Sequence, residues 1–438
     1  MKNRVLVADL KKHAGKTASV SGWLYKRRLL GGLNFLVLRD RTGLVQILLE
    51  DEKELKKLDG LQLGTVLTVT GEVLADDRAP GGVEIHDPQL EILSTVKDVM
   101  PIEIDKPISH KPEHHTTLFE NRTIGLRNTS EQLIFKIQAA IERYIREYFE
   151  SYDFVQIHTP KLLAEPTEGG AEVFKMDYFG KTATLAQSPQ FYKQMMVGVY
   201  ERVYEIGPVY RAEPSTTTRH MSEYISVDGE MGFITELKEV CDFLGGMINF
   251  VCEKVWSEHK GELEKLQAKP VKLTKEIPEI TLSELHEQYF KATNEDTRHE
   301  KDPTPAEERF ASEYALKKWG SEAVYITEFP ASEMKFYHRK NAQNSHVADR
   351  ADLIFRGVEI TTLSMRENNY ETLLTQLEEI GGDPKHPGFK HYLQAFQYGM
   401  PSHGGFGLGL ERLTQKIIGL ENVKEATLFP RDMQRLAP

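Results

Sequence analysis

The sequence lacks several features that define special classes of protein. None of its apolar stretches reaches the roughly 20 residues that a membrane-spanning helix needs, so we expect no membrane partner. The segment MKNRVLVADLKKHAGK has no apolar core of the kind found in secretory signals, which predicts a cytoplasmic protein. The motif G-x-x-x-x-G-K-[ST] is absent, which excludes the P-loop way of binding nucleotide phosphates.

Cysteine is scarce, with Cys241 and Cys252 as the two examples among 438 residues. Both fall on one predicted helix about three turns apart, so they share a face but lie too far apart to form a disulfide. We expect buried thiols in a reducing compartment.

Charge is distributed unevenly. The chain has a net charge of -11, which argues against indiscriminate binding of nucleic acid. Its first 50 residues nevertheless hold ten Lys or Arg against three acidic residues. This end of the protein could face phosphate groups, and a solvated basic surface is the alternative.

The basic end also carries five β-rich runs separated by turn residues. The runs are TASVSGWLY, LNFLVLRD, GLVQILLE, TVLTVTGEVLA and GGVEIHDPQLEIL. Five short strands predict an OB-fold barrel over residues 1–97, a fold that binds single-stranded nucleic acid through an aromatic and basic sheet face. Arg27, Phe35 and Gln46 could supply a cation, a stacking ring and an amide for a base edge. In the alternative interpretation Phe35 belongs to the barrel core.

A second domain is expected over residues 130–438, after a Pro-rich charged linker at 98–129. It opens with apolar residues at helical spacing over 131–150, with Ser130 as the expected N-cap, and continues into the strand VQIHTPKLL. The charged stretch 256–308 is expected to be a peripheral insertion.

Polar clusters in this domain fall at predicted strand ends and loops. Arg211 and Glu213 follow an apolar strand, Asp352 and Glu359 lie in a predicted hairpin, and Arg412 follows the Gly-rich run GGFGLGLERL. Arginines suit the phosphates of ATP and carboxylates suit Mg²⁺. Taken singly, each cluster could equally be a surface ion pair.

The order of these clusters resembles the class II aminoacyl-tRNA synthetases. Residues 131–160 ending at Pro160, the stretch YRAE…RHMSEY and the run GFGLGLERL resemble the three motifs of that family. The chain is most similar to the archaeal type of aspartyl-tRNA synthetase, within the aspartate, asparagine and lysine subgroup. The resemblance implies an α+β fold with an antiparallel catalytic sheet flanked by helices, a homodimer, and an anticodon-binding barrel.

The resemblance also implies a role for each ATP-site residue. Arg211 and Arg412 would be the catalytic cations, with Arg211 at the α-phosphate and Arg412 over the adenine ring and at the γ-phosphate. Asp352 and Glu359 would hold Mg²⁺, and Glu359 also belongs to the ATP site. The other expected ATP-binding residues are Glu213, Arg219, His220 and Tyr224.

The amino-acid pocket is implied in the same way. Glu168, Ser188 and Gln190 would hold the ammonium group, Lys193 and Arg366 would pair with the substrate side chain, and Asp228 would orient Lys193. Two cations in a closed pocket favour aspartate over asparagine, because a neutral amide would leave charge unpaired. The predicted function is aspartate–tRNA ligase. The alternatives are an asparaginyl enzyme, a paralogue that activates a related acid, or a nucleic-acid-binding regulator with an inactive catalytic domain.

The chain departs from the family pattern just before Arg366. The family has glycines in this strand where its backbone lies against the substrate, whereas this chain has Thr362 and Leu363. We expect the Leu363 side chain to occupy space in the amino-acid pocket and to weaken aspartate binding. The run SEMKFYHRKN also differs from the S-E-x-K-P-F-Y of the family.

Overall fold

The computed structural model describes residues 4–30, 33–164, 172–214 and 217–438. It divides the chain into two compact units, Met1–Gln132 and Leu133–Pro438, each with its own hydrophobic core. Within these described ranges, no helix combines the length and the apolar character that crossing a bilayer requires.

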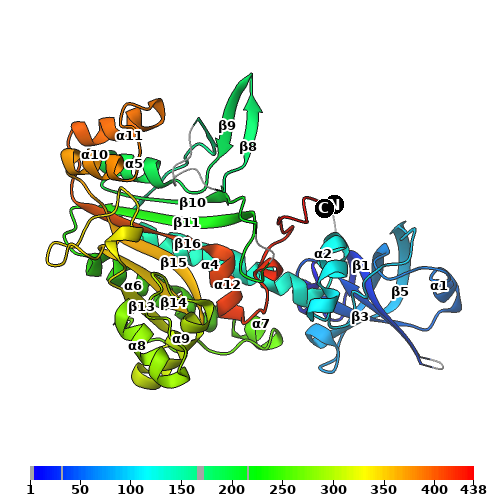
Figure 1. The fold of residues 1–438 in the computed structure, drawn as a ribbon. Coiled ribbons are helices and arrows are strands. Elements are labelled where there is room, and N and C mark those ends of the chain that lie inside the picture. The colour runs from blue at the N-terminus through cyan, green and yellow to red at the C-terminus, as the bar shows by residue number, and fades with distance from the viewer. Residues whose placement is uncertain (1–3, 31–32, 165–171, 215–216) are drawn as a thin grey trace. The chain divides into compact units, whose positions relative to one another are not determined.

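The first unit is built on a closed barrel with the strand order β1-β2-β3-β5-β4 (Figure 1). Buried and partly exposed residues alternate along β3, so that Val45, Ile47 and Leu49 point into the barrel. The predicted five-stranded barrel is confirmed. Its strands are β1 (Thr17–Leu30), β2 (Leu33–Arg39), β3 (Leu44–Leu49), β4 (Val66–Ala75) and β5 (Val83–Ser94), with the short helices η1 (Val7–His13), α1 (Glu52–Lys56) and η2 (Pro80–Gly82).

The expected linker contains three short helices, η3 (Pro112–His114), α2 (His115–Glu120) and α3 (Arg122–Gly125). Arg122 is fully buried, and its Nη1 lies 3.1 Å from a carboxylate oxygen of the equally buried Glu131. A buried ion pair of this kind fixes local geometry, because separating the two charges inside the protein is costly.

The long helix α4 (Thr129–Ser151) begins slightly earlier than the sequence predicts. Ser130 lies inside the helix and is not its N-cap; the side chain of Asn128 accepts a hydrogen bond from the Ser130 amide at 2.9 Å instead. The apolar stripe of α4 packs within its own unit, where Ile137, Ile141 and Tyr144 belong to the main core.

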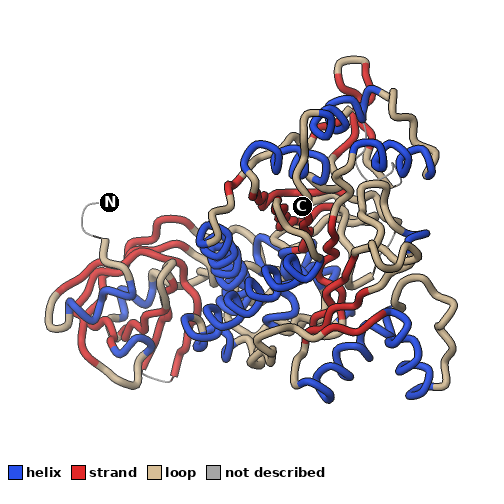
Figure 2. Tube along the Cα trace, turned by 90° about the vertical axis from the view of Figure 1, so that its left-hand side faces the viewer, coloured by secondary structure: helices blue, strands red, loops and turns tan. Residues whose placement is uncertain are grey.

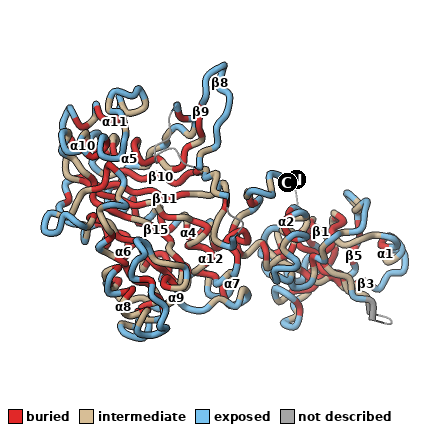
Figure 3. Tube along the Cα trace, viewed as in Figure 1, coloured by how far each residue is buried: buried red, intermediate tan, exposed pale blue. Residues whose placement is uncertain are grey.

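The second unit is built on an eight-stranded sheet in the order β12-β13-β14-β15-β16-β11-β10-β6 (Figure 1). The five central pairings are antiparallel and the two outermost are parallel. The core of this unit is made by residues of the sheet together with residues of the helices that pack on it (Figure 3). The strands are β6 (Val155–Gln156), β10 (Arg202–Tyr210), β11 (Glu223–Gly232), β12 (Glu279–Thr281), β13 (Ala323–Thr327), β14 (Arg350–Phe355), β15 (Val358–Met365) and β16 (His403–Gly409).

Helices cover the sheet and pack around its ends (Figure 2). The two cysteines are buried on α6 as predicted, and burial raises the pKa of Cys252 to about 12. The helices are α5 (Gln190–Tyr200), α6 (Leu237–Glu258), α7 (Lys260–Lys265), α8 (Leu282–Thr293), α9 (Pro305–Trp319), α10 (Tyr370–Glu379), α11 (Pro387–Gln397) and α12 (Leu410–Ile418), with the 3-10 turns η4 (Ala331–Glu333) and η5 (Val423–Ala426). A small sheet joins β7 (Leu162–Leu163), β9 (Lys181–Leu185) and β8 (Lys175–Tyr178).

Residues 256–308 include α7, β12, α8 and the first turn of α9. Strand β12 is an edge of the eight-stranded sheet and pairs in parallel with β13. This stretch is therefore joined to the sheet through backbone pairing.

Candidate active site

A cleft of about 490 Å³ opens over the central strands of the second unit. Its floor comes from β11, β15 and β16, and its rim comes from the loop after β10, the start of α5 and the segment 333–338. The sequence-predicted residues Ser188, Gln190, Lys193, Arg211, Glu213, Arg219, His220, Tyr224, Asp228, Glu359, Arg366 and Arg412 all line this cleft.

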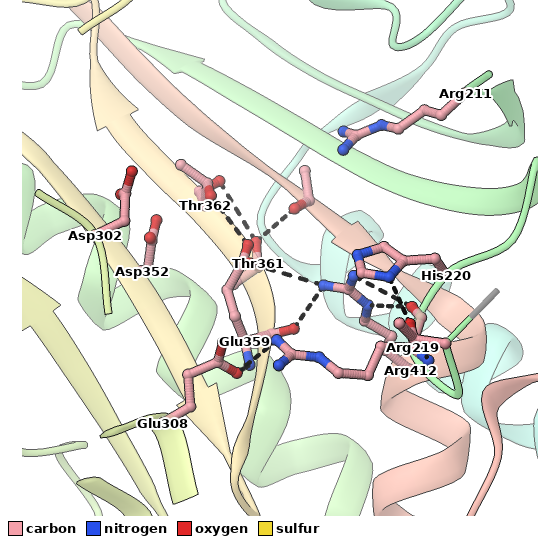
Figure 4. A network of polar contacts seen from close by, with 12 residues as sticks. Arg211, Arg219, His220, Asp302, Glu308, Asp352, Glu359, Thr361, Thr362 and Arg412 are labelled. Atoms are coloured by element: carbon pink, nitrogen blue, oxygen red, sulfur yellow. Dashed lines mark hydrogen bonds and ion pairs between the residues drawn. The ribbon is translucent and has the colours of Figure 1, made fainter. Parts of the chain in front are cut away.

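Arg211 stands at one end of the cleft, directly after β10. Its side chain is 44% exposed, its Nη1 lies 3.5 Å from Glu213, and its guanidinium carbon lies 5.7 Å from the ring centre of Tyr224. Tyr224 is on β11, opposite Val209 of β10, so the hairpin pairing places the arginine near the ring. Figure 4 shows the Arg211 side chain extending into the site, above Arg219, His220 and Arg412 in this view. A cation beside a flat aromatic surface is suited to a nucleotide.

Arg219 and Arg412 form the other cationic part of this end of the cleft (Figure 4). Arg412 Nη1 donates to the carbonyl of Glu359 at 2.8 Å, and its Nη2 donates to the carbonyl of Arg219 at 3.3 Å. His220 contacts the Thr217 hydroxyl at 2.6 Å, and partial burial together with the nearby Arg412 lowers the pKa of this imidazole. Three arginines therefore converge on a site that can neutralise a polyanion.

The opposite end of the cleft is buried and carries paired charges. Lys193 Nζ donates to Asp228 at 2.9 Å, as predicted, and to the carbonyl of Phe406 at 2.8 Å. Arg366 binds Glu230 through Nε at 2.8 Å and Nη2 at 3.1 Å, and its Nη1 donates to the Ser364 hydroxyl at 2.5 Å.

Strand β16 gives these carboxylates room. A Cβ atom at Gly405 would lie 2.2 Å from a Glu230 carboxylate oxygen and 2.1 Å from the Gly229 carbonyl. Glycine is therefore required where β16 passes β11, and the Gly-rich run serves the pocket as well as the strand.

The pairing of Arg366 with Glu230 corrects one argument from the sequence. Lys193 and Arg366 were expected to offer positive charge that an asparagine side chain would leave unpaired. Instead, the two cations are balanced by Asp228 and Glu230. Burial acts to raise the pKa of Glu230, but Arg366 and Lys193 outweigh it, so the pKa lies below its ordinary value. The charges of these four side chains therefore cancel before any substrate enters the pocket.

The expectation for Leu363 is wrong. Leu363 is fully buried in the main core, paired with Ala351 on β14 and with Phe406 on β16. Thr362 and Ser364 point to the other face of β15, and Thr362 lines the cleft. Because successive residues of a strand face opposite sides, Leu363 takes no volume from the amino-acid pocket.

Ser188 and Gln190 lie at the start of α5, where the backbone N–H of Gln190 donates to the Ser188 hydroxyl at 3.2 Å. The side-chain Nε2 of Gln190 is buried and has no hydrogen-bond partner among the residues that the structure describes. A polar atom left in this way is a candidate contact for a ligand. The predicted residue Glu168 lies outside the described residues.

The two predicted metal ligands fit a divalent cation only in part. The Glu359 side chain is 34% exposed, lines the cleft and accepts a hydrogen bond from the Thr362 hydroxyl at 3.2 Å. Asp352 is 4% exposed, and its carboxylate is bound by Arg350 Nη2 at 2.8 Å. Burial raises the pKa of Asp352 to about 6, although Arg350 acts in the opposite direction. In the described part of the chain, no cluster of three or more His, Cys, Asp or Glu is arranged to hold a metal.

The barrel unit presents two of its three predicted residues on one face. Phe35 on β2 is half-buried, and Gln46 on β3 donates to Glu84 at 2.6 Å. The strand register pairs Phe35 with Arg28, whereas Arg27 pairs with the buried Leu36 and donates to the carbonyl of Leu58. The cation directly opposite Phe35 is therefore Arg28, not Arg27.

Sequence reasoning missed Glu230, Ser364, Arg350 and Glu308, all of which contact predicted site residues. A signal existed for the first two, because Glu230 follows Asp228 by two residues and Ser364 precedes Arg366 by two, which places each pair on one strand face. Glu308 carries no local signal, since its partner Arg219 is distant in the sequence.

Comparison with known proteins agrees with this geometry. The family described as tRNA synthetases class II (D, K and N) matches residues 114–433, and an OB-fold nucleic acid binding domain matches residues 18–93. The aspartate–tRNA(Asp/Asn) ligase of Thermus thermophilus is 40% identical over 99% of this chain and 100% of its own length. The aspartate–tRNA(Asp) ligase of Pyrococcus horikoshii is 38% identical over 97% of both chains.

A solved structure has a similar fold. An asparaginyl-tRNA synthetase of Pyrococcus horikoshii complexed with asparaginyl-adenylate matches with a TM-score of 0.91 at 28% identity and covers 100% of both chains. Together with the barrel and the arginine-lined cleft, these matches define an enzyme with a nucleic-acid-binding unit and an ATP-dependent ligase unit. The chain belongs to the class II aminoacyl-tRNA synthetases, in the aspartate, lysine and asparagine group.

Proposed function

We propose that this protein is an aspartate–tRNA ligase, which activates aspartate with ATP and transfers the aspartyl group to the 3′ end of tRNA. The proposal is carried by one observation: the same cleft has an arginine-lined end and a buried end that contains Lys193 and Arg366. Several relatives 36–40% identical over nearly the whole chain are named as aspartate ligases, which supports the same substrate.

The chemistry of activation fits the arginine-lined end. An oxygen of the aspartate α-carboxylate attacks the α-phosphorus of ATP, the bond from that phosphorus to the β-phosphate oxygen breaks, and pyrophosphate leaves. Arg211 is assigned to the α-phosphate, where a fixed cation stabilises the charge that develops in the transition state. No general base is required, because the attacking carboxylate is ionised at neutral pH.

The remaining residues of this end are assigned to the nucleotide. Tyr224 offers its ring to adenine with Glu213 beside it, and Arg412 approaches from α12. Arg219 and His220 are assigned to the β- and γ-phosphates. Glu359 is the residue best placed to hold Mg²⁺, which when bound with ATP would neutralise part of the charge on the leaving pyrophosphate.

Selection of aspartate is assigned to Lys193 and Arg366, held by Asp228 and Glu230. The guanidinium of Arg366 uses one N–H of Nη1 and one of Nη2 for Ser364 and Glu230, so a second N–H on each nitrogen can meet a substrate carboxylate. Asparagine is the second candidate, because Lys193 and Arg366 already have carboxylate partners and a structurally similar protein is an asparaginyl enzyme.

The barrel is assigned to the anticodon, with Phe35 as a stacking ring, Gln46 as a base contact, and Arg28 and Arg27 as nearby cations. We also propose a cytoplasmic homodimer. The exposed Tyr152 and Val155 after α4 are available to a second copy of the chain, while the apolar stripe of α4 is already buried within one copy.

ATP–pyrophosphate exchange driven by each amino acid in turn tests the proposal. Aspartate should support exchange at least about tenfold better than asparagine, and every other amino acid should remain near background. Exchange with asparagine but not aspartate would assign the enzyme to the second candidate, and exchange with neither would contradict both.

A further inference from the structure

Helix α9 reaches the ATP end of the cleft through one acidic side chain. Glu308 is 6% exposed, and both of its carboxylate oxygens accept hydrogen bonds from Arg219 Nη2, at 2.6 and 2.8 Å (Figure 4). The carboxylate also accepts from the backbone amide of Glu359 at 2.8 Å. Glu308 thus ties together α9, the loop that follows β10, and strand β15.

The helix that carries Glu308 is firmly attached to the sheet. One turn further along α9, the Ser312 hydroxyl accepts from the Gly357 amide at 2.8 Å, in the turn between β14 and β15. The preceding residue Glu307 is buried and binds His286 of α8 at 2.6 Å, and it closes a capping box with Thr304. Contacts on both sides of Glu308 therefore hold its carboxylate in a defined place.

Arg219 is held on one edge and left available on the other. Nη2 is used by Glu308, while Nε is buried and, like Nη1, donates to no residue within the described ranges of the chain. The same arginine lines the cleft, and its carbonyl accepts from Arg412. An arginine fixed by a carboxylate behind it loses less side-chain entropy when it binds a phosphate group in front.

We propose that Glu308 is a positioning residue for the phosphate tail of ATP, acting through Arg219. The inference rests on the proposed ATP-dependent function and extends it to the stretch 256–308. Glu308 does not touch the substrate. It holds the Arg219 guanidinium where the β- and γ-phosphates arrive, and its carboxylate accepts a hydrogen bond from the backbone amide of Glu359 at the start of β15.

The test compares ligands that have these phosphates with one that lacks them. Glu308→Ala should raise the KM for ATP and for pyrophosphate in exchange roughly tenfold, since a charge-assisted hydrogen bond is lost, with a smaller change in kcat. Binding of a non-hydrolysable aspartyl-adenylate analogue, which has no β- or γ-phosphate, should stay within about twofold of wild type by calorimetry. The KM values of Glu308→Gln for ATP and pyrophosphate should lie between those of wild type and Glu308→Ala, because the glutamine amide oxygen can still accept a hydrogen bond from Arg219.

Two further variants separate positioning from general damage. Glu313→Ala removes an exposed acid from the same helix and should leave both KM values unchanged. Arg219→Ala combined with Glu308→Ala should raise the KM for ATP no further than Arg219→Ala alone, because Glu308 is proposed to act on the phosphates through Arg219.

Each outcome decides a different question. If Glu308→Ala and Glu308→Gln leave the KM for ATP and pyrophosphate unchanged, or weaken the adenylate analogue as much as ATP, the positioning role is wrong. Glu308→Gln alone carries the test if the alanine variant fails to fold. A wild-type protein without exchange activity would instead contradict the proposed function.

Discussion

Shortening Leu363 tests whether this side chain belongs to the core or to the substrate pocket. Leu363→Ala removes three carbons from a fully buried position between Ala351 and Phe406. Burial of these carbons contributes about 2 kcal/mol, and the cavity left behind brings the expected loss of stability to about 3 kcal/mol. For a unit of this size, such a loss lowers the unfolding temperature by roughly 5 to 10 °C.

The assay pairs thermal unfolding with exchange kinetics at a temperature where the variant remains folded. We expect Leu363→Ala to lower the unfolding temperature while the KM for aspartate stays within about twofold of wild type. The matched control is Thr362→Ala on the opposite face of the strand. It should change stability little and alter the KM for ATP, because the Thr362 hydroxyl donates a hydrogen bond to Glu359, which is assigned to the Mg²⁺ of ATP. A Leu363 variant with unchanged stability and a clearly lowered KM for aspartate would refute this placement.

Three other predictions concern separate parts of the protein. Arg211→Ala should slow adenylate formation by about 100-fold or more, whereas Arg202→Ala, at the other end of β10, should be near normal in pyrophosphate exchange; equal activity of the two variants would contradict the assignment. Burial raises the pKa of the Glu411 carboxyl from 4.5 to about 7, so the folded protein binds this proton more tightly and loses about 3 kcal/mol of stability as pH rises from about 4.5 to 7. Glu411→Gln keeps an acceptor for the Ile225 amide and should therefore be more stable than wild type to urea at pH 8 but not at pH 4.5; equal stability at both pH values would count against it. Phe35→Ala should raise the KM for tRNA roughly 5- to 150-fold without affecting pyrophosphate exchange, and a parallel fall in both activities would give the barrel another role.

The parts of the fold that follow from local patterns were predictable from sequence. Alternation along the barrel strands and the helical spacing of residues 131–150 depend on neighbouring residues, so the barrel and the long helix are where they were expected. The cleft residues were also found, because the three motifs hold the main cations and acids in short stretches.

The errors arose where strand register or distant contacts decide the outcome. Counting back in twos from Arg366 reaches Ser364 and Thr362 and skips Leu363, whereas the family resemblance, with glycines at this point of the strand, placed Leu363 in the pocket. Strand register also decides which cation lies beside Phe35: the pairing of β1 with β2 shifts between Leu24 and Lys26 and places Arg28, which the sequence did not single out, opposite Phe35. Glu308 could not be assigned from the sequence, because its role depends on α9 packing beside β15.

The identity of the amino acid attached to tRNA tests the central claim most directly. The protein would be incubated with ATP, tRNA and an equal mixture of aspartate and asparagine, and the aminoacyl ester would be identified by mass spectrometry. The account predicts aspartyl-tRNA as the main product, formed through the pocket of Lys193 and Arg366. Asparaginyl-tRNA as the main product, or an adenylate that is never transferred to tRNA, would contradict it.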